Sequence, residues 1–494
     1  MTTAMVVGSG PNGLAAAVTL ARAGLEVTVL EAAEQPGGGT RSAELTVPGV
    51  LHDECSGFHP LAVETAFSAI AHLDRYGLEW RRPEVQYAQP LDDGTGAAAW
   101  QDVATTAEHL GSDGPMWQRV FGPLSENFPE ITEDFLQPML HLPHHVCKLA
   151  HFGAFAGMPA TLIGKLWHTP QARALFAGVI AHAFRPFGSL ASSAIGVALG
   201  TAAHTYGWPV AAGGSQAISA AMIAALEDLG GRVETGVRVR SLLDLPPADV
   251  VMLDTSPAAA LEIGGAQIPY PVRCGLRSFR HGPGAFVVNF AVEGGIPWQY
   301  APARLAGTVH LGGSYHEVAT AEREIHRGRM PERPFVLLGQ QYLADPGRSA
   351  GDVHPIDAYA HVPAGFRGDA TVAIEEQIER FAPGFRDRIV GRYVRLAQDL
   401  EAHNANYVGG DIVTGANSAW QLLMRPRPSI NPYSLGAPGL YLCSAATPPG
   451  AGAHGMCGYN AAQSALAELR RAGRIEERSP VRGDGDRAGW PENV

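Results

Sequence analysis

Lysine and cysteine are scarce in this sequence of 494 residues, and long apolar runs are absent. The only lysines are Lys148 and Lys165, so arginine carries nearly all of the positive charge. The five cysteines lie far apart, without a C-x-x-C pair or zinc-like spacing, which argues against a structural metal and fits a reducing compartment. No apolar run reaches the roughly 18 residues of a membrane-spanning helix. We therefore expect a cytoplasmic protein without a signal peptide.

A surplus of positive charge is also missing. The chain has 48 acidic and 36 basic residues and a net charge of −12, so we expect no nucleic-acid partner. Hydrophobic residues make up 46% of the sequence and charged residues 17%, proportions that are typical of a well-packed globular protein. A chain of this length is expected to form two or three domains.

A third absence is local, because no Asp or Glu occurs in residues 135–226, the acid-free stretch. One interpretation is a set of buried helices with hydrogen-bonded histidines. The other is an apolar substrate channel, or a surface that contacts the periphery of an anionic membrane. The stretch has no carboxylate to pair with a cationic substrate, unless acids from residues 269–404 reach the same pocket. No metal site is expected at its His141, His144 and His145, because no acid or cysteine stands at ligand spacing.

The first forty residues contain a dinucleotide-binding pattern. An apolar run over residues 4–8 leads into Gly8, Gly10 and Gly13 at G-x-G-x-x-G spacing, followed by a helical pattern and a second strand that ends at Glu31. The first glycine permits a tight turn, the second lets the backbone approach a pyrophosphate, and the third lets helix and strand pack closely. The N-terminus of the helix offers N–H groups to the phosphates, and Glu31 stands where a carboxylate binds a ribose hydroxyl.

The residues after Glu31 favour FAD over NAD. Gly37, Gly38 and Arg41 follow it in the segment EAAEQPGGGTRS. This segment resembles the continuation found in FAD proteins of the glutathione-reductase-like and amine-oxidase-like superfamily. The resemblance implies that the glycines let the chain pass under the flavin end of the cofactor, and that the arginine neutralises pyrophosphate charge.

Two later segments return to the same domain. Residues 213–243 predict a glycine turn, a helix and a strand, and in the resembling flavoproteins the residue at the position of Val239 contacts the adenine. Residues 439–473 predict a buried strand, a glycine-rich turn and a long helix that begins near Asn460. The turn repeats the first motif with Gly450, Gly452 and Gly455. A second nucleotide site is one interpretation, and a segment that closes the flavin site is the more economical one.

Together these motifs resemble the phytoene-desaturase-related FAD-dependent oxidoreductases, most closely the subgroup of pyridine nucleotide-disulfide oxidoreductase domain-containing protein 2. Segments such as GSGPNG, GGSQA, FRHGPGAF, NANYVGGDI and LMRPRP match that subgroup in order over nearly the whole chain. Two departures occur near the C-terminus. Pro448 replaces a histidine that relatives carry before Pro-Gly-Gly-Gly, and Ser444-Ala445 replaces a Gly-Asp pair whose aspartate holds a ribityl hydroxyl. No redox dithiol supports disulfide chemistry.

The resemblance implies an α/β fold, with a Rossmann-like FAD-binding domain and an inserted α+β substrate domain. We expect residues 1–88, 205–268 and 405–475 to form the first and residues 89–204 and 269–404 the second, followed by a mobile tail over 476–494.

Two residues are candidates for a catalytic role. His454 lies inside the C-terminal glycine turn and is alternatively a solvent-facing turn residue. Trp420 precedes LMRPRP and is alternatively an ordinary core aromatic.

The function that follows is hydride transfer between flavin N5 and a C–C bond of an apolar, isoprenoid-like substrate, by a dehydrogenase, desaturase or reductase. Two alternatives stay open. One is a flavin amine oxidase, a group that often has a flavin-linked cysteine near the C-terminal segment. Cys443 and Cys457 lie in that region but do not match its usual setting. The other is a non-catalytic FAD-binding interaction protein.

Overall fold

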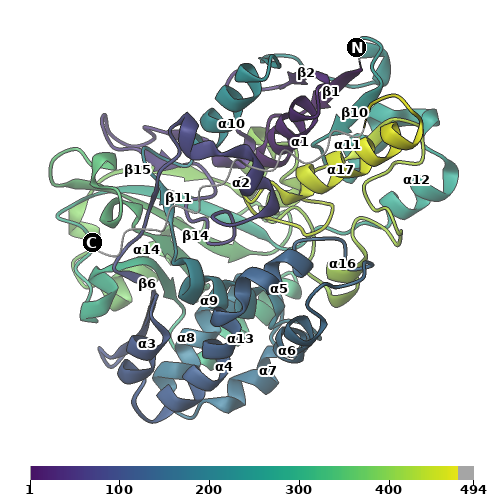
Figure 1. Cartoon of the computed structure of the whole chain (residues 1–494). Coiled ribbons are helices and arrows are strands. Elements are labelled where there is room, and N and C mark those ends of the chain that lie inside the picture. The colour runs from purple at the N-terminus through teal and green to yellow at the C-terminus, as the bar shows by residue number, and fades with distance from the viewer. Residues whose placement is uncertain (1, 477–494) are drawn as a thin grey trace.

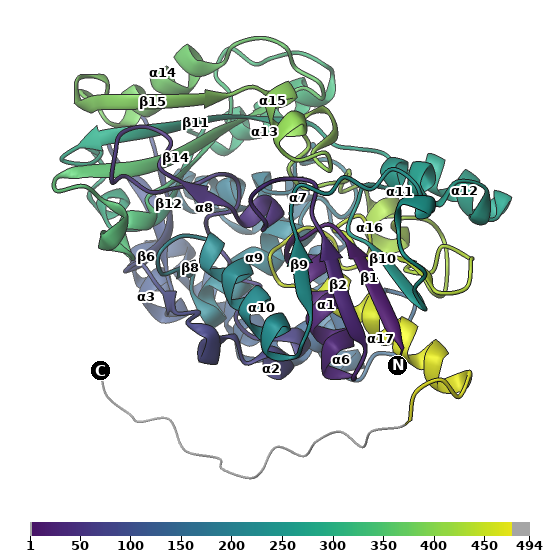
Figure 2. The same ribbon diagram turned by 90° about the horizontal axis from the view of Figure 1, so that it is seen from above.

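A five-stranded parallel sheet contains the first and the last strand of the computed structural model, which describes residues 2–476. Its strand order is β16 (Leu440–Leu442), β10 (Val250–Leu253), β1 (Thr3–Val7), β2 (Glu26–Leu30) and β9 (Arg232–Glu234). Every neighbouring pair is parallel, so the carboxyl ends of all five strands meet at one edge. Figure 2 shows four of these strands, β9, β2, β1 and β10, side by side. In such sheets ligands bind at that edge.

Helices cover both faces of the parallel sheet because its apolar side chains alternate between them. Val6, Val29 and Met252 pack against α1 (Pro11–Arg22), α10 (Gln216–Asp228) and α17 (Met456–Arg471). Met5, Leu30 and Leu253 pack against α11 (Pro257–Gly264) and α12 (Tyr270–Arg277) on the other face. Strands that are buried on both faces have continuous apolar sequences, and the apolar run over residues 4–8 predicts such a strand.

A seven-stranded mixed sheet forms the second layer of the molecule. Its strand order is β15 (Ile389–Arg395), β11 (Gly284–Glu293), β14 (Val353–Val362), β13 (Val336–Gly339), β12 (Ala306–Leu311), β6 (Val85–Pro90) and β7 (Gly96–Trp100). One face packs on α14 (Thr371–Phe381). On the opposite face, side chains from every second position of the strands line a cavity. They are both polar and apolar and include Asn289, Asp357 and Tyr359.

The acid-free stretch forms much of a helical layer that Figure 1 shows beside the mixed sheet. The layer contains α3 (Val103–His109), α4 (Gly114–Glu126), α5 (Phe128–Phe135), α6 (Val146–Ala156), α7 (Ala160–Ile163), α8 (Pro170–Ala181), α9 (Ala194–Tyr206) and α13 (Tyr315–His326). Most residues of α8 and α9 are buried, whereas α6 is largely exposed. The first interpretation of the stretch therefore fits α8 and α9 but not α6.

No single helix within residues 2–476 is both long and apolar enough to cross a bilayer. Helix α6 and residues 160–166, which meet at 86°, reach the required length and composition only as a pair.

The fold class predicted from the motifs is confirmed, and two element boundaries differ from the prediction. Helix α17 begins at Met456 rather than near Asn460, because Gly455 adopts a positive φ of 70° and caps the helix there. Strand β6 begins at Val85 and pairs in the mixed sheet, so the boundary predicted at residue 88 cuts a strand. The domain ranges otherwise stay a prediction, and the predicted tail lies outside the described residues except for its first residue.

Candidate FAD site and adjoining cavity

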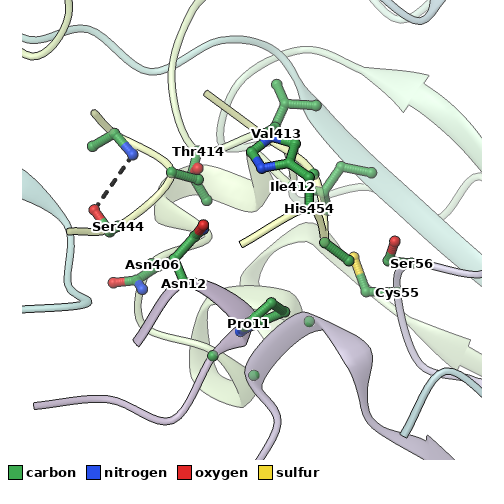
Figure 3. A pocket seen from close by; sticks show the side chains of 18 of the residues that line it. Pro11, Asn12, Cys55, Ser56, Asn406, Ile412, Val413, Thr414, Ser444 and His454 are labelled. Carbon is green, nitrogen blue, oxygen red and sulfur yellow. Dashed lines mark hydrogen bonds between the residues drawn. The ribbon is translucent and has the colours of Figure 1, made fainter. Parts of the chain in front are cut away.

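A cavity of about 980 Å³ lies between the carboxyl edge of the parallel sheet and the mixed sheet. The residues that follow four parallel strands line it: Gly8 after β1, Glu31 after β2, Asp254 after β10 and Ser444 after β16. Figure 3 shows Pro11 and Asn12 of the first turn of α1 around the same pocket as Ser444 and His454. The two glycine-rich turns therefore face one cavity, which favours the interpretation of the second turn as a closing segment.

The first glycine turn has the geometry that its spacing predicts. Gly8 has a φ of 102°, and a Cβ at Gly13 would lie 2.2 Å from the Gly8 carbonyl oxygen, so both positions require glycine. Glu31 accepts hydrogen bonds from the Ser9 backbone N–H at 2.9 Å and from the Ser9 hydroxyl at 2.6 Å. These contacts hold the carboxylate at the edge of the cavity, where a ribose hydroxyl is expected.

The continuation after Glu31 packs directly on this turn. A Cβ at Gly38 would lie 3.0 Å from the Gly10 Cα, so the two backbones touch. The Arg41 guanidinium donates to the Gly38 and His403 carbonyl oxygens and lines the cavity, as does Val239. Gly37 does not line the cavity; its N–H donates to the Ser9 carbonyl oxygen and holds the segment in place.

Asp254 is a functional residue that the sequence pattern does not reveal. Its Oδ2 accepts a hydrogen bond from the Gly13 N–H at 3.0 Å, and a Cβ at Gly10 would lie 2.6 Å from the same oxygen. Burial, together with the nearby charge of Glu31, raises the pKa of Asp254 to about 7. The Asp254 carboxyl group thus accepts a hydrogen bond from one of the N–H groups at the N-terminus of α1, which would otherwise be free to bind a pyrophosphate.

The C-terminal turn places His454 at the cavity and fixes it there. The His454 side chain is 3% exposed, so it is not a solvent-facing turn residue, and its Nδ1 accepts a hydrogen bond from the Met456 N–H at the start of α17. Burial lowers the pKa of His454 to about 4, so the ring is neutral at pH 7. Gly452 lines the cavity, whereas Gly450 and Gly455 shape the turn from behind it.

Trp420 is not in the site. The side chain is 65% exposed on α16 (Ala419–Met424), and the neighbouring Ala419, Leu422 and Leu423 line the cavity in its place. Helix α16 presents its other face to the cavity. Its sequence is too short and too irregular for a hydrophobic periodicity to predict this orientation. Both expectations for Trp420, a site residue and a core residue, are therefore wrong.

The cavity wall beyond the dinucleotide region is mainly apolar. Residues of α5, α6 and α9 supply it, among them Phe135, Leu149, Phe152 and Leu199. His182, which follows α8, also lines it and contacts His310, with 2.9 Å between the two Nε2 atoms. Burial lowers the pKa of His182 to about 3, so this ring too is neutral at pH 7.

One acid from residues 269–404 does reach the cavity. Asp357 on β14 lines it, with a side chain that is 13% exposed. Its carboxylate already accepts four hydrogen bonds, at 2.6 to 3.1 Å: from His52, the Asp53 backbone, Asn289 and Gln341. A carboxylate has about four acceptor positions. Asp357 is therefore saturated by its own network, which orders the floor of the cavity.

The histidines of the acid-free stretch and the two C-terminal cysteines lie as follows. No three His, Cys, Asp or Glu side chains within residues 2–476 are grouped closely enough to hold a metal ion. The His144 and His145 backbone N–H groups donate to the buried Asp134 carboxylate, and ring nitrogens of His141 and His144 lie 3.3 and 3.5 Å from it. Cys443 and Cys457 are fully buried and do not line the cavity.

Comparison with known families defines the class of protein. Residues 6–69 match the family model described as an NAD(P)-binding Rossmann-like domain, which covers the first glycine turn and the Gly37-Gly38 segment. The cavity fits a dinucleotide that runs from Glu31 and Val239 past Gly10 to the C-terminal turn. Residues 6–69 therefore belong to a Rossmann-like dinucleotide-binding domain, and the cofactor of this site is FAD.

Two relatives are similar in sequence to this chain. The chain is 28% identical over 195 residues to pyridine nucleotide-disulfide oxidoreductase domain-containing protein 2 of Rattus norvegicus, a match over 37% of this chain and 33% of the rat protein. It is 27% identical over 387 residues to phytoene dehydrogenase of Streptomyces griseus, a match over 71% of each chain. These relatives match the phytoene-desaturase-related family that the motifs resemble, and the chain spans about a third of the length of the rat protein.

A solved structure supports the fold. Wild-type putrescine oxidase superposes with a TM-score of 0.59 at 17% identity, over 95% of this chain and 99% of that chain. At this identity the likeness concerns the fold alone.

Proposed function

We propose that the protein transfers hydride between FAD and a C–C bond of an apolar, isoprenoid-like substrate. The observation that carries the proposal is the apolar wall of α5, α6 and α9, which adjoins the dinucleotide region in one cavity. An apolar ligand gains about 25 cal/mol per Å² of buried surface, which suffices for micromolar binding without an ion pair. The similarity to Streptomyces griseus phytoene dehydrogenase supports the same substrate class.

The residues around the cavity have defined tasks in this proposal. FAD, when bound, supplies the chemistry of hydride acceptance and donation. The apolar wall orients the substrate and excludes water, and the neutral His454 and His182 add no charge to the cavity at pH 7. No proton-transfer group is required for the hydride step itself.

The competing substrate class is an amine. Asp357 is the feature that favours it, because it brings a carboxylate to the cavity. Its four acceptor positions are filled, so an ammonium group would have to displace a partner before it could pair. The apolar substrate is favoured on this ground.

The entrance of the cavity supports a peripheral membrane contact as part of the same proposal. Exposed apolar side chains surround α6 and α16, among them Leu142, Val146, Leu190 and Trp420, while Leu190 and Leu423 also line the cavity. A cytoplasmic protein that takes an isoprenoid from a membrane would need such an entrance.

The test is a titration of the FAD-loaded protein in dilute detergent, followed by flavin absorbance. We expect saturable shifts with farnesene and farnesol, and none with putrescine or cyclohexylamine. Leu149→Gln, in the cavity wall, should weaken the binding of the isoprenoids about tenfold. The matched control is Leu243→Gln, which is 91% exposed and lies outside the cavity and its entrance, and should leave binding unchanged. Shifts with the amines alone would overturn the proposal in favour of an amine oxidase.

A flavin that no donor or substrate of either class reduces would instead support the non-catalytic binding protein. Anaerobic reduction with the same compounds, followed at the flavin absorbance band, decides this point.

A further inference from the structure

Arg425 is a buried cation without a carboxylate partner. The side chain is 1% exposed and lines the cavity at the C-terminal turn. Its guanidinium donates to the Ala445 carbonyl oxygen and to the Asn417 side-chain oxygen, both at 3.2 Å, and its Nε has no partner among the described residues. Arg425 forms no ion pair within residues 2–476.

Asp411, the carboxylate that acts electrostatically on Arg425, is engaged elsewhere. Asp411 accepts hydrogen bonds from the backbone N–H groups of Gly282, Val413 and Gly415, and its Oδ2 lies 3.3 Å from His281. Burial therefore lowers the pKa of Arg425, because no counter-ion offsets the loss of water around the charge.

The C-terminal turn is shaped around this guanidinium. A Cβ at Gly450 would lie 2.3 Å from Arg425 Nη1, and Gly450 has a φ of 118°, so the glycine makes room for the arginine. Ala445, which accepts from Arg425, stands where the resembling proteins carry a ribityl-binding aspartate. In this chain a fixed positive charge faces that part of the cavity.

We propose that Arg425 is an anion-binding residue, whose counter-ion is an anionic group of a molecule bound in the cavity. A buried unpaired guanidinium is costly, and a planar oxyanion is the partner that matches its donors. Two sources have this chemistry. Two electrons and one proton leave one negative charge on the flavin ring, and a carboxylate on an apolar substrate carries one permanently.

The experiment compares Arg425→Met and Arg425→Lys with the wild type, all loaded with FAD. The matched control is Arg427→Met, because Arg427 is also partly buried but does not line the cavity. The midpoint potential of the bound flavin and the dissociation constants of farnesol and farnesoic acid are measured. FAD content is determined for each variant before the titrations.

A lower midpoint potential in Arg425→Met, largely restored in Arg425→Lys, would assign the counter-ion to the flavin. At least tenfold weaker binding of farnesoic acid, with farnesol binding and the potential unchanged, would assign it to a substrate carboxylate. Either result supports the proposal. Arg425→Met that retains FAD, the wild-type potential and the wild-type affinity for farnesoic acid would overturn it. Should Arg425→Met fail to fold, Arg425→Gln takes its place, because it also removes the charge but keeps a polar side chain. The wild-type potential and the wild-type affinity for farnesoic acid in Arg425→Gln would overturn the proposal.

The proposal is separable from the proposed function. If amines replaced the isoprenoids as ligands, the potential of Arg425→Met would still report on the anion site.

Discussion

Glu31 and Asp254 both face the first glycine turn, with opposite consequences for the cofactor. Glu31 is held by Ser9 and stands at the end of the cavity where a ribose donates hydrogen bonds. Asp254 lies against Gly10 and Gly13, where a pyrophosphate is expected, so its ionised form repels the cofactor.

Asp254 predicts a pH dependence of FAD affinity. Its pKa in the folded protein is about 7 instead of 3.8, and a nearby pyrophosphate raises it further. FAD binding is then accompanied by proton uptake, so the affinity should fall as pH rises above about 7, by up to tenfold per pH unit. Asp254→Asn keeps an acceptor for Gly13 and removes the titration.

The measurement is the FAD dissociation constant of wild type and Asp254→Asn from pH 6 to pH 9. We expect the FAD affinity of the wild type to fall as pH rises. The affinity of the variant should stay constant over this range and exceed that of the wild type at high pH. Parallel profiles for the two proteins would contradict the role given to Asp254.

Gly10→Val tests the glycine turn itself. A branched side chain at this position would meet the Asp254 carboxyl at 2.6 Å and extend into the pyrophosphate path. We expect loss of the flavin spectrum after dialysis, with the fold retained by circular dichroism. Gly188→Val is the control, because a Cβ there meets no atom within 4 Å. A full flavin spectrum in Gly10→Val would show that the cofactor binds elsewhere.

At the scale of elements, the segment around α6 combines exposure with apolar character. Leu142 precedes the helix with 91% of its surface exposed. The two α5 carboxylates Glu130 and Glu133 contact bases of this segment, Lys148 and His145, which offset the repulsion of anionic lipid. Leu243 is exposed to the same 91%, but in a different segment outside the acid-free stretch.

Vesicle binding distinguishes these two leucines. Leu142→Asp should reduce co-sedimentation with anionic phosphatidylserine-containing vesicles severalfold, because a carboxylate would enter the apolar headgroup boundary. Leu243→Asp should sediment like the wild type. Equal sedimentation of the two variants would exclude the α6 segment as the membrane contact.

At the scale of the whole molecule, buried histidines link stability to pH. Burial lowers the pKa of His59, His204 and His454 to about 4, against 6.5 for an exposed histidine. The unfolded chain therefore binds more protons than the folded one between pH 6.5 and pH 4, and stability falls as pH falls through this window.

Urea unfolding of the FAD-loaded protein at several pH values checks this prediction. Each of these three histidines should lower the free energy of unfolding by about 1 kcal/mol at pH 5.5 relative to pH 7.5. Asp254 acts in the opposite direction, because its raised pKa lowers stability as pH rises toward 7, but it is a single group. An unfolding midpoint that does not move between pH 7.5 and pH 5.5 would contradict the account.

The sequence alone determined the parts of this protein that depend on local chemistry. The glycine turn, Glu31 and the Gly37-Gly38 continuation are consecutive, so the strand, the turn and the helix around them follow from steric and hydrogen-bonding requirements within forty residues. The family resemblance extended this prediction to the second glycine turn and to the α/β fold. His454 was identified for the same local reason, since it lies inside a turn made by glycines.

Only the tertiary structure decided which distant side chains share the cavity. Asp254 and Arg425 meet the two glycine turns from segments far away in the chain, and no spacing rule connects them. Trp420 lies on a short helix whose orientation depends on what it packs against, and the packing turns that residue outward. Burial also decided protonation, because the pKa of His454 or Asp254 depends on the surrounding atoms rather than on the neighbouring residues in the sequence. Local steric rules thus determined the cofactor motif, whereas long-range packing determined the charges that surround it.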